Sequence, residues 1–317
     1  MTELELFFLG TSSAVPTEHR GLSSIAVVRG GEILLFDAGE GTQRRFAEAG
    51  LGFNKKMKIF ITHMHGDHCV GLLGLLQTMS MLNRSNPLSV YGPPGLLSFV
   101  RCNIRMLKFG LTFPLEVNTV KDDGVVVEEK DYLIRAYRGE HHITNYAYVL
   151  DEKERPGVFH PERARRLGVP EGELWSKLQH GEPIKLGEEK VYPSEVLGSS
   201  RPGRKIAISG DTRPTARLRR CVKGADVAVM DSTYFDDHAD KAREHLHMTA
   251  REAAEIASDA GVKLLVLTHF SSRYEDVASY IYQAADIHPN AIAASDRMVL
   301  DVPYPDEGLP RVKQAKK

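Results

Sequence analysis

A short segment of the chain gathers three histidines and an aspartate directly after an apolar run. The segment reads IFITHMHGDHCVG and contains His63, His65, Asp67 and His68. Positions i and i+2 of an extended segment face the same way, so His63 and His65 can bind one metal ion while Asp67 and His68 turn toward a second. Imidazole and carboxylate ligands together suit zinc or a similar first-row divalent ion. Because burying such groups without partners costs free energy, their clustering favours a metal site over a loop of chance composition.

Three later residues stand where apolar runs end. They are His141 in GEHHITNYAY, Asp211 in ISGDTRP and His269 in VLTHFSSRY. Residues at the same end of neighbouring strands converge in space, and so these three can join the first motif in one site. The combined set has enough ligands for two metal ions. Chemistry alone does not separate His141 from its neighbour His142.

The elements that must position these residues are short strands alternating with helices. The apolar pattern predicts strands over residues 4–9, 24–28, 33–36, 58–62, 125–127, 133–137, 206–211, 227–231 and 264–269. It predicts helices over residues 41–50, 71–83, 96–109 and 249–261, the last with a Thr cap and a Gly stop. The chain is therefore expected to be an α/β protein with helices covering sheets.

Residues 151–200 differ from the rest of the chain in composition and periodicity. They are rich in charge, Pro and Gly and have little sustained periodicity, which is typical of an insertion. A length of 317 residues is compatible with either one enlarged domain or two domains. The interpretation adopted is a single domain, residues 1–317, carrying residues 151–200 as an inserted arm.

Composition narrows the class of protein. No apolar run approaches the roughly 20 residues needed to cross a bilayer, and the acidic start lacks the basic and apolar parts of a signal peptide, so a cytoplasmic protein is expected. The three cysteines are widely spaced and form no CxxC pair, which argues against disulfides and thiolate zinc sites. Cys69, next to His68, is interpreted as core packing. With a net charge of −1, any role on nucleic acid must depend on local patches. Residues 201–223, with eight basic residues and one acid, are such a patch.

The motif H-x-H-x-D-H, with a later His, Asp and His, resembles the metallo-β-lactamase superfamily. Within it, FLGTSSAVPT, FDAGEGTQRRF, GDTRP and LTHFSSRY resemble ribonuclease Z, the endonuclease family that trims tRNA 3′ ends. The resemblance covers residues 4–300, including the insertion. It implies an αββα sandwich of two mixed sheets flanked by helices, with an inserted flexible arm.

The resemblance also implies roles for single residues. His63, His65 and His141 would bind one divalent ion, Asp67, His68 and His269 the other, and Asp211 would bridge the two ions, which are expected to be Zn²⁺. Asp67 would also act as the base that activates a bridging water.

His247 would assist the leaving group, with His245 as its competitor. In DAGEGTQ, Asp37 and Gln43 can orient ligands or stabilise a turn, and both interpretations stay open. The family's Pro-x-Lys-x-Arg-Asn loop is represented here by Pro16 to Gly21, which keeps only the Pro and the Arg.

The implied substrate is precursor tRNA, cut to leave a 3′-hydroxyl on the tRNA and a 5′-phosphate on the trailer. The arm would grip the tRNA elbow, and the chain would act as a homodimer. Two alternatives remain open at this point. A different two-metal phosphodiesterase or thioester hydrolase of the superfamily would lack the inserted arm, and an RNA-binding protein without catalysis would have a broken ligand set.

Overall fold

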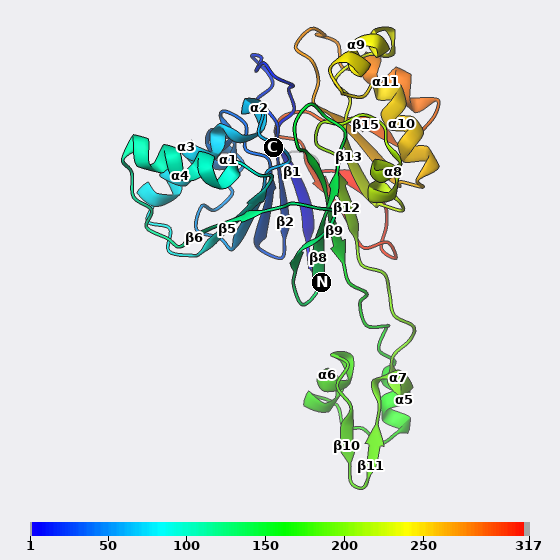
Figure 1. Ribbon diagram of the computed structural model, residues 1–317. Helices are drawn as coiled ribbons and strands as arrows, with labels where there is room; N and C mark the ends of the chain where they lie inside the picture. Colours follow the sequence, from blue (N-terminus) through cyan, green and yellow to red (C-terminus); the bar gives the residue numbers. More distant parts are fainter. Residues whose placement is uncertain (1, 314–317) are drawn as a thin grey trace.

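Two β-sheets pack face to face in the computed structural model, which describes residues 2–313 (Figure 1). The first sheet has the strand order β17-β16-β1-β2-β3-β4-β5-β6. Its strands are β1 (Leu4–Gly10), β2 (Ser24–Arg29), β3 (Glu32–Phe36), β4 (Met57–Phe60), β5 (Leu88–Gly92), β6 (Leu115–Thr119), β16 (Val299–Asp301) and β17 (Arg311–Val312). The pairings from β3 to β6 are parallel and the others antiparallel, so the sheet is mixed.

The second sheet is also mixed and has the order β15-β14-β13-β12-β9-β8-β7. Its strands are β7 (Gly124–Glu128), β8 (Tyr132–Arg138), β9 (Tyr146–Glu152), β12 (Lys205–Ile208), β13 (Val227–Asp231), β14 (Leu264–Thr268) and β15 (Ala291–Ala293). The strands from β12 to β15 run parallel, and so their carboxyl ends meet at one edge. Polar residues that follow these strands are thereby brought together.

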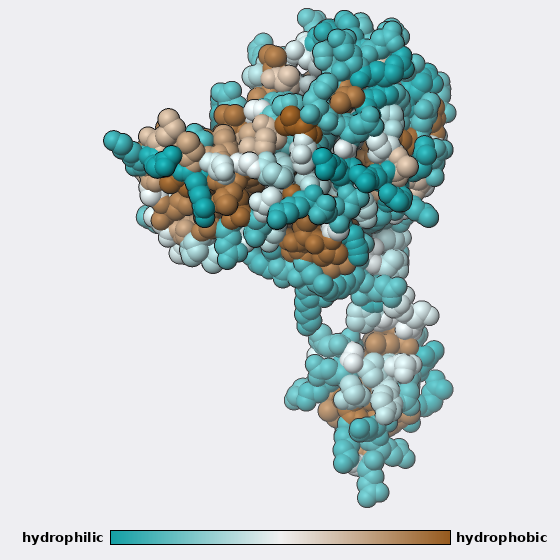
Figure 2. Space-filling view, in the orientation of Figure 1, coloured by the Kyte–Doolittle hydropathy of each residue, from teal (hydrophilic) through white to brown (hydrophobic). Residues whose placement is uncertain are grey.

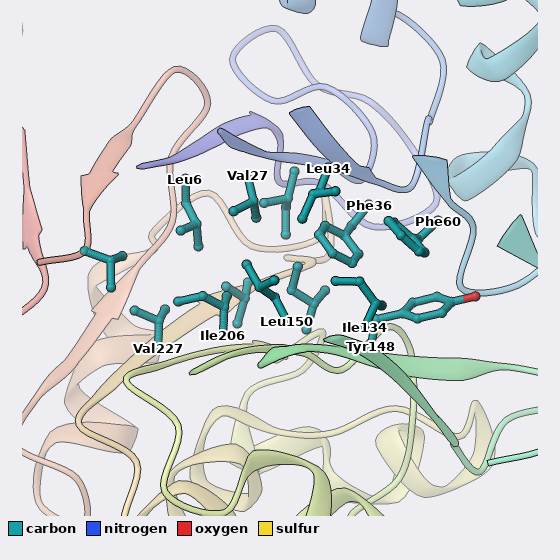
Figure 3. Packing of buried hydrophobic residues seen from close by; sticks show 14 of the residues in the cluster. Leu6, Val27, Leu34, Phe36, Phe60, Ile134, Tyr148, Leu150, Ile206 and Val227 are labelled. Atoms are coloured by element: carbon teal, nitrogen blue, oxygen red, sulfur yellow. The ribbon is translucent and has the colours of Figure 1, made fainter. Parts of the chain in front are cut away.

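The space between the sheets is filled by alternating apolar side chains. In β1, Leu4, Leu6 and Phe8 are buried while Glu5 and Phe7 are partly exposed, as the two-residue period of a strand requires. Figure 3 shows Leu6, Val27, Leu34, Phe36 and Phe60 of the first sheet facing Ile134, Tyr148, Leu150, Ile206 and Val227 of the second. This interior holds the two sheets, and with them the strand ends, in a fixed relation.

Helices cover the two outer faces. On the first sheet lie α1 (Thr42–Glu48), α2 (Gly66–Cys69), α3 (Gly71–Met81) and α4 (Leu96–Leu107). On the second lie α8 (Ala216–Val222), α10 (Ala250–Asp259) and α11 (Ala278–Ala285), with the short η1 (Asp236–His238) and α9 (Ala239–Glu244) preceding α10. Thr249 caps the start of α10, as the sequence predicted, and it forms a capping box with Glu252. Within residues 2–313, no helix combines the length and apolar character needed to cross a membrane.

The inserted arm projects away from the sandwich on two extended segments (Figure 1). It contains α5 (Pro161–Arg166), α6 (Glu173–Gln179), the hairpin of β10 (Ile184–Leu186) and β11 (Glu189–Val191), and α7 (Pro193–Val196). The arm has a small apolar core of its own, in which Ala164, Leu178, Ile184 and Val196 are buried. Such a core was not evident from the weak periodicity of this segment.

Two expected boundaries were wrong. The insertion was expected from residue 151, but β9 continues to Glu152, because Asp151 and Glu152 still pair with β8. The segment between β9 and β12 is therefore residues 153–204. The metal motif was expected in an extended segment, and His65 is extended, but residues from Gly66 onward form the short helix α2.

Candidate functional site

Three imidazole rings converge beyond the C-terminal end of β4. His63 and His65 follow this strand, and His141 comes from the loop between β8 and β9. The Nδ1 atom of His65 lies 3.0 Å from Nε2 of His63 and 3.2 Å from Nε2 of His141. These three nitrogens are close enough together to bind one cation.

A second group adjoins the first and consists of Asp67, His68, Asp211 and His269. The Nε2 atoms of His68 and His269 are 3.3 Å apart. The Asp211 carboxylate lies 3.3 Å from Nε2 of His68 and 3.4 Å from Nε2 of His269. It is also 3.6 Å from Nε2 of His63 in the first group. Asp211 therefore lies between the two groups.

The local backbone explains how one motif serves both groups. His65 has an extended conformation and stands at the start of α2, whose first turn carries Asp67 and His68. The change from extended to helical backbone turns these two side chains away from His63 and His65. His269, the first residue after β14, has a positive φ of 63°, which bends the chain sharply there.

Two residues next to the first sheet orient His63 and His68. Asp37, which follows β3, accepts hydrogen bonds from the backbone N–H and the hydroxyl of Thr62 at 2.7 and 2.9 Å. Its Oδ2 atom is 2.7 Å from Nδ1 of His68, and the Thr62 hydroxyl is 3.0 Å from Nδ1 of His63. Asp37 therefore orients the His68 ring, which settles its role between the two that the sequence left open. Gln43, the other residue considered with it, instead accepts a hydrogen bond from Thr78 of α3.

Asp231 and Thr233 orient two histidines on the opposite side. Asp231, the last residue of β13, is buried and accepts hydrogen bonds from the backbone N–H and hydroxyl of Thr233. Its Oδ2 atom lies 2.9 Å from Nδ1 of His247, and the Thr233 hydroxyl lies 2.8 Å from Nδ1 of His269. Sequence reasoning did not identify Asp231 as a site residue. The signal was its place at the end of an apolar strand, the same signal that identified Asp211.

The chemistry of the donors fits divalent metal ions. Nδ1 of His141 lies 3.2 Å from the carbonyl of Leu246, so its proton points outward and the Nε2 lone pair points into the first group. Nδ1 of His68 likewise faces Asp37. Several lone pairs and two carboxylates that face one another repel unless a cation lies between them. The residues present can therefore hold metal ions in both groups.

Burial and neighbouring charges shift the pKa values of these histidines in opposite directions. Burial, reinforced by His68, holds the pKa of His63 well below its ordinary value. Burial also acts on His68, but the carboxylates of Asp211 and Asp37 outweigh it and hold the pKa of His68 well above its ordinary value. Burial lowers the pKa of His269 as well, but the carboxylates of Asp211, Asp231 and Asp67 together outweigh it and raise this pKa to about 10. A metal ion that binds here must therefore displace protons from His68 and His269.

An open cleft of about 630 Å³ leads to the two groups. Its floor includes His65, Asp67, His141 and His269, and its wall includes the loop at Ser13 to Val15. A polar cleft above convergent metal ligands suits a charged, polar substrate.

The two ambiguous histidine pairs differ clearly in their surroundings. His141 belongs to the three-imidazole group, whereas the side chain of His142 is exposed and belongs to neither group. His247 is partly buried against Asp231, whereas His245 is exposed beside Tyr234.

Fewer basic side chains of residues 201–223 are accessible to nucleic acid than the composition of this segment indicated. The side chains of Arg204 and Arg213 form ion pairs with Glu152 and Glu252 and are largely buried, so the expectation of a basic patch for nucleic acid is wrong for these two. Arg217 is half-exposed and lines a cavity of about 880 Å³ beside His141 and His142.

Two mixed sheets packed face to face, with helices outside and a His/Asp site at the strand ends, define a metallo-β-lactamase fold. Residues 176–270 match the family described as beta-lactamase superfamily domain, and residues 4–108 match that of anti-Pycsar protein Apyc1. The solved structure of human tRNase Z, short form, has a TM-score of 0.70 and 27% identity and covers 94% of this chain and 99% of that one.

Curated relatives are more similar still. Ribonuclease Z of Nitrosopumilus maritimus is 50% identical over 299 residues, which are 94% of this chain and 100% of the relative. Ribonuclease Z of Myxococcus xanthus is 43% identical over 96% of this chain and 100% of the relative. The chain belongs to the ribonuclease Z family. It is accordingly an endoribonuclease that acts on phosphodiester bonds.

Proposed function

We propose that this enzyme removes the 3′ trailer from precursor tRNA, leaving a 3′-hydroxyl on the tRNA and a 5′-phosphate on the trailer. The observation that supports it best is the convergence of two adjoining groups of imidazoles and carboxylates at the floor of an open cleft. The family relationship supplies the class of substrate.

We assign His63, His65 and His141 to one divalent ion, Asp67, His68 and His269 to a second, and Asp211 to both, and we expect both ions to be Zn²⁺. When bound, two such ions supply positive charge to the phosphoryl oxygens and lower the pKa of water. The nitrogen and carboxylate donors match the preferences of zinc.

Asp67 is proposed to orient the attacking water and accept its proton. Its Oδ2 atom accepts a hydrogen bond of 2.9 Å from the backbone N–H of Ala14, which fixes the carboxylate at the cleft wall. Burial raises its pKa, but His269 and His68 outweigh this effect and hold the pKa of Asp67 below its ordinary value. The carboxylate therefore stays ionised at neutral pH and can receive a hydrogen bond from water.

His247 is proposed to donate a proton to the departing 3′-oxygen. Burial lowers its pKa, but the nearby Asp231 carboxylate outweighs burial and raises the pKa of His247 above its ordinary value. A raised pKa increases the fraction of molecules in which His247 is protonated near neutral pH, and this suits a general acid. Asp231 in turn orients the ring so that Nε2, rather than Nδ1, is free to donate.

The arm is proposed to bind the tRNA elbow, far from the cut. It lies outside the sandwich and contributes no residue to either metal group (Figure 1). Its contacts would contribute binding energy that positions the scissile phosphate. We further propose that the enzyme works in the cytoplasm, which agrees with its three free cysteines.

The enzyme is proposed to act as a homodimer, associating through the ends of α3 and α4. Figure 2 shows apolar surface over these helices, where Met81 is 82% and Met106 71% exposed, with Leu82 and Leu107 beside them in the sequence. Exposed apolar surface of this kind favours protein association. Sedimentation should show a species of twice 35.3 kDa, and Met81→Lys with Met106→Lys should convert it to monomer. A parental protein that sediments as a monomer at micromolar concentration would contradict the dimer.

The test of the activity is a cleavage map. The purified enzyme, loaded with zinc, is incubated with one unprocessed precursor tRNA, and both new ends are sequenced. We expect a single cut near the end of the acceptor stem, with a 3′-hydroxyl upstream and a 5′-phosphate downstream. An enzyme that hydrolyses bis(p-nitrophenyl) phosphate but leaves the precursor intact would instead be a different two-metal phosphodiesterase of the superfamily.

A further inference from the structure

Two extended segments connect the arm to the sandwich, and we call residues 153–158 and 198–204 the neck. They are paired at two places. The backbone N–H of Arg155 donates to the carbonyl of Arg201 at 2.7 Å, and the reverse bond is 2.9 Å. Closer to the arm, the N–H of Gly198 donates to the carbonyl of Val158 at 2.8 Å. Two such pairings hold the segments together. They do not by themselves set the direction in which the neck leaves the β-sandwich, which we call the body.

A turn near the C-terminus holds both segments of the neck. Asp306 forms ion pairs with Arg155 from one segment and, at 3.2 Å, with Arg201 from the other. The backbone N–H of Glu307 donates to the carbonyl of Tyr304 at 2.8 Å, which closes the turn that presents Asp306. One carboxylate thereby ties the entering and the leaving segment to the same point.

Tyr304, from the same turn, packs against two arginines of the neck. The guanidinium carbon of Arg155 lies 3.4 Å and that of Arg204 lies 3.9 Å from the centre of its ring. Tyr304 is only 5% exposed, and a desolvated cation against an aromatic face is stabilising. The ring therefore restrains both ends of the neck where it meets the body.

The body side of this contact is rigid. The side chain of Arg204 is buried and donates to Glu152, at the end of β9, at 2.7 and 2.9 Å. It also donates at 3.0 Å to the carbonyl of Val302, whose own N–H donates to Leu4 of β1. The turn and the neck are thus attached to strands of both sheets.

We infer that Tyr304 and Asp306 are positioning residues that clamp the neck and hold the arm in the direction in which it can bind the substrate. This inference rests on the proposed role of the arm in binding precursor tRNA. Without the clamp, the neck would swing and only a fraction of molecules would present the arm correctly. Apparent affinity falls in proportion to that fraction, while the chemical step in the bound complex is unchanged.

The first experiment measures the orientation of the arm without RNA. Spin labels are attached to cysteines replacing Glu188 on the arm and Lys121 on the body, in a Cys102→Ser background that removes the exposed natural thiol. The labelled chain is diluted with unlabelled chain so that each assembly carries one labelled pair. We expect a narrow distance distribution that broadens in Asp306→Asn and stays narrow in Asp306→Glu. An unchanged distribution in Asp306→Asn overturns the clamp.

Asp301→Asn is the matched control. It is the same substitution in the same C-terminal part of the chain. It removes the ion-pair partner of an exposed arginine, Arg311, which does not belong to the neck. Arg201→Gln removes the Asp306–Arg201 ion pair by changing its partner in the neck. An effect that it shares with Asp306→Asn cannot come from a folding defect specific to the substitution of Asp306. We expect Arg201→Gln to broaden the distribution and Asp301→Asn to leave it narrow.

The second experiment measures cleavage by the same unlabelled variants. For precursor tRNA, we expect Asp306→Asn to raise KM about tenfold with little change in kcat, and Asp306→Glu to restore the parental KM. Hydrolysis of bis(p-nitrophenyl) phosphate should stay parental in all variants. A broadened distribution with an unchanged KM for tRNA would overturn the positioning role. A parental enzyme that fails to cut precursor tRNA would instead refute the proposed function, while the distance measurement still decides the clamp.

Discussion

Hydrogen bonds to the outer nitrogens of the histidines determine which nitrogen faces the site. Thr62 lies against Nδ1 of His63, Asp37 against Nδ1 of His68 and Thr233 against Nδ1 of His269. Each contact leaves Nε2 directed at the proposed metal position. A partner of this kind sets the ring orientation and the basicity of a ligand, and so Asp37 and Thr233 belong to the site although they touch no metal position.

Metal content should distinguish His141 from His142. If His141 is a ligand, His141→Ala removes one of three imidazoles from the first group, and bound zinc should fall from about two ions per chain toward one. His142→Ala should keep the parental content, because this side chain is exposed and lies outside both groups. Elemental analysis after zinc reconstitution checks both variants, and the opposite ranking would reverse the assignment.

The Asp231–His247 pair should control the alkaline limb of the pH–rate profile. As a general acid, His247 is active when protonated, so a raised pKa keeps the rate high at neutral pH and the rate is lost as pH rises through that pKa. Asp231→Asn removes the negative charge that raises this pKa, and the limb should move to lower pH. Each pH unit of movement lowers the rate about tenfold at pH values above both the parental and the new pKa.

Asp226→Asn is a suitable control for this profile. Asp226 is a buried carboxylate immediately before β13, the strand that ends in Asp231, and it pairs with Lys263 at 2.7 Å. Its substitution should alter stability without moving the limb. If Asp231→Asn left the limb in place, the acid role of His247 would be refuted.

Among the elements, α2 and α3 determine how the first motif is presented. Glycine is required where α3 begins, since a Cβ on Gly71 would lie 1.9 Å from the carbonyl oxygen of Gly39. This close approach places the motif against the turn that follows β3, and that turn carries Asp37. The distance between Asp37 and His68 therefore depends on a contact between two glycines.

Gly71→Ala should disturb both stability and metal binding. The added methyl group forces α3 away from the turn, at a cost of about 1–3 kcal/mol. Thermal unfolding of the metal-free protein and zinc content after reconstitution measure the two effects. Gly66→Ala is the matched control, because its Cβ would meet Val70 at an ordinary 3.5 Å and should leave both quantities nearly unchanged.

At the scale of the whole molecule, substrate binding and chemistry are proposed to occupy separate units. The arm has its own apolar core, and Phe159 and Leu197 form a β-bridge where it begins and ends. The ends of residues 159–197 are therefore close together, so a short Gly/Ser linker can replace this segment at little entropic cost.

Replacing residues 159–197 in this way should separate two activities. Hydrolysis of bis(p-nitrophenyl) phosphate needs only the cleft and should survive, whereas cleavage of precursor tRNA should fall at least about 100-fold, equivalent to about 2.7 kcal/mol. Initial rates on both substrates, with zinc content as a check of folding, give the result. Parental tRNA cleavage would refute the role of the arm, and loss of both activities with the metals would mean that the core depends on it.

Much of the fold and of the candidate site was predictable from local patterns. Alternating apolar residues indicated the inner strands, Thr249 marked the start of α10, and H-x-H-x-D-H with three later residues indicated the side chains that converge in the candidate site. These signals are local because strand period, helix caps and metal-ligand spacing act over a few residues. The similarity to a known family then supplied the sandwich fold, which the structure confirms.

Other features were decided only by tertiary structure, because they depend on partners distant in sequence. Asp231 faces His247 sixteen positions later, and Arg204 is removed from any RNA-binding surface by Glu152, fifty-two positions earlier. Asp306 meets the neck across more than a hundred residues. No local pattern encodes these contacts, since they exist only after the two sheets have packed and brought their strand ends and the C-terminal turn together.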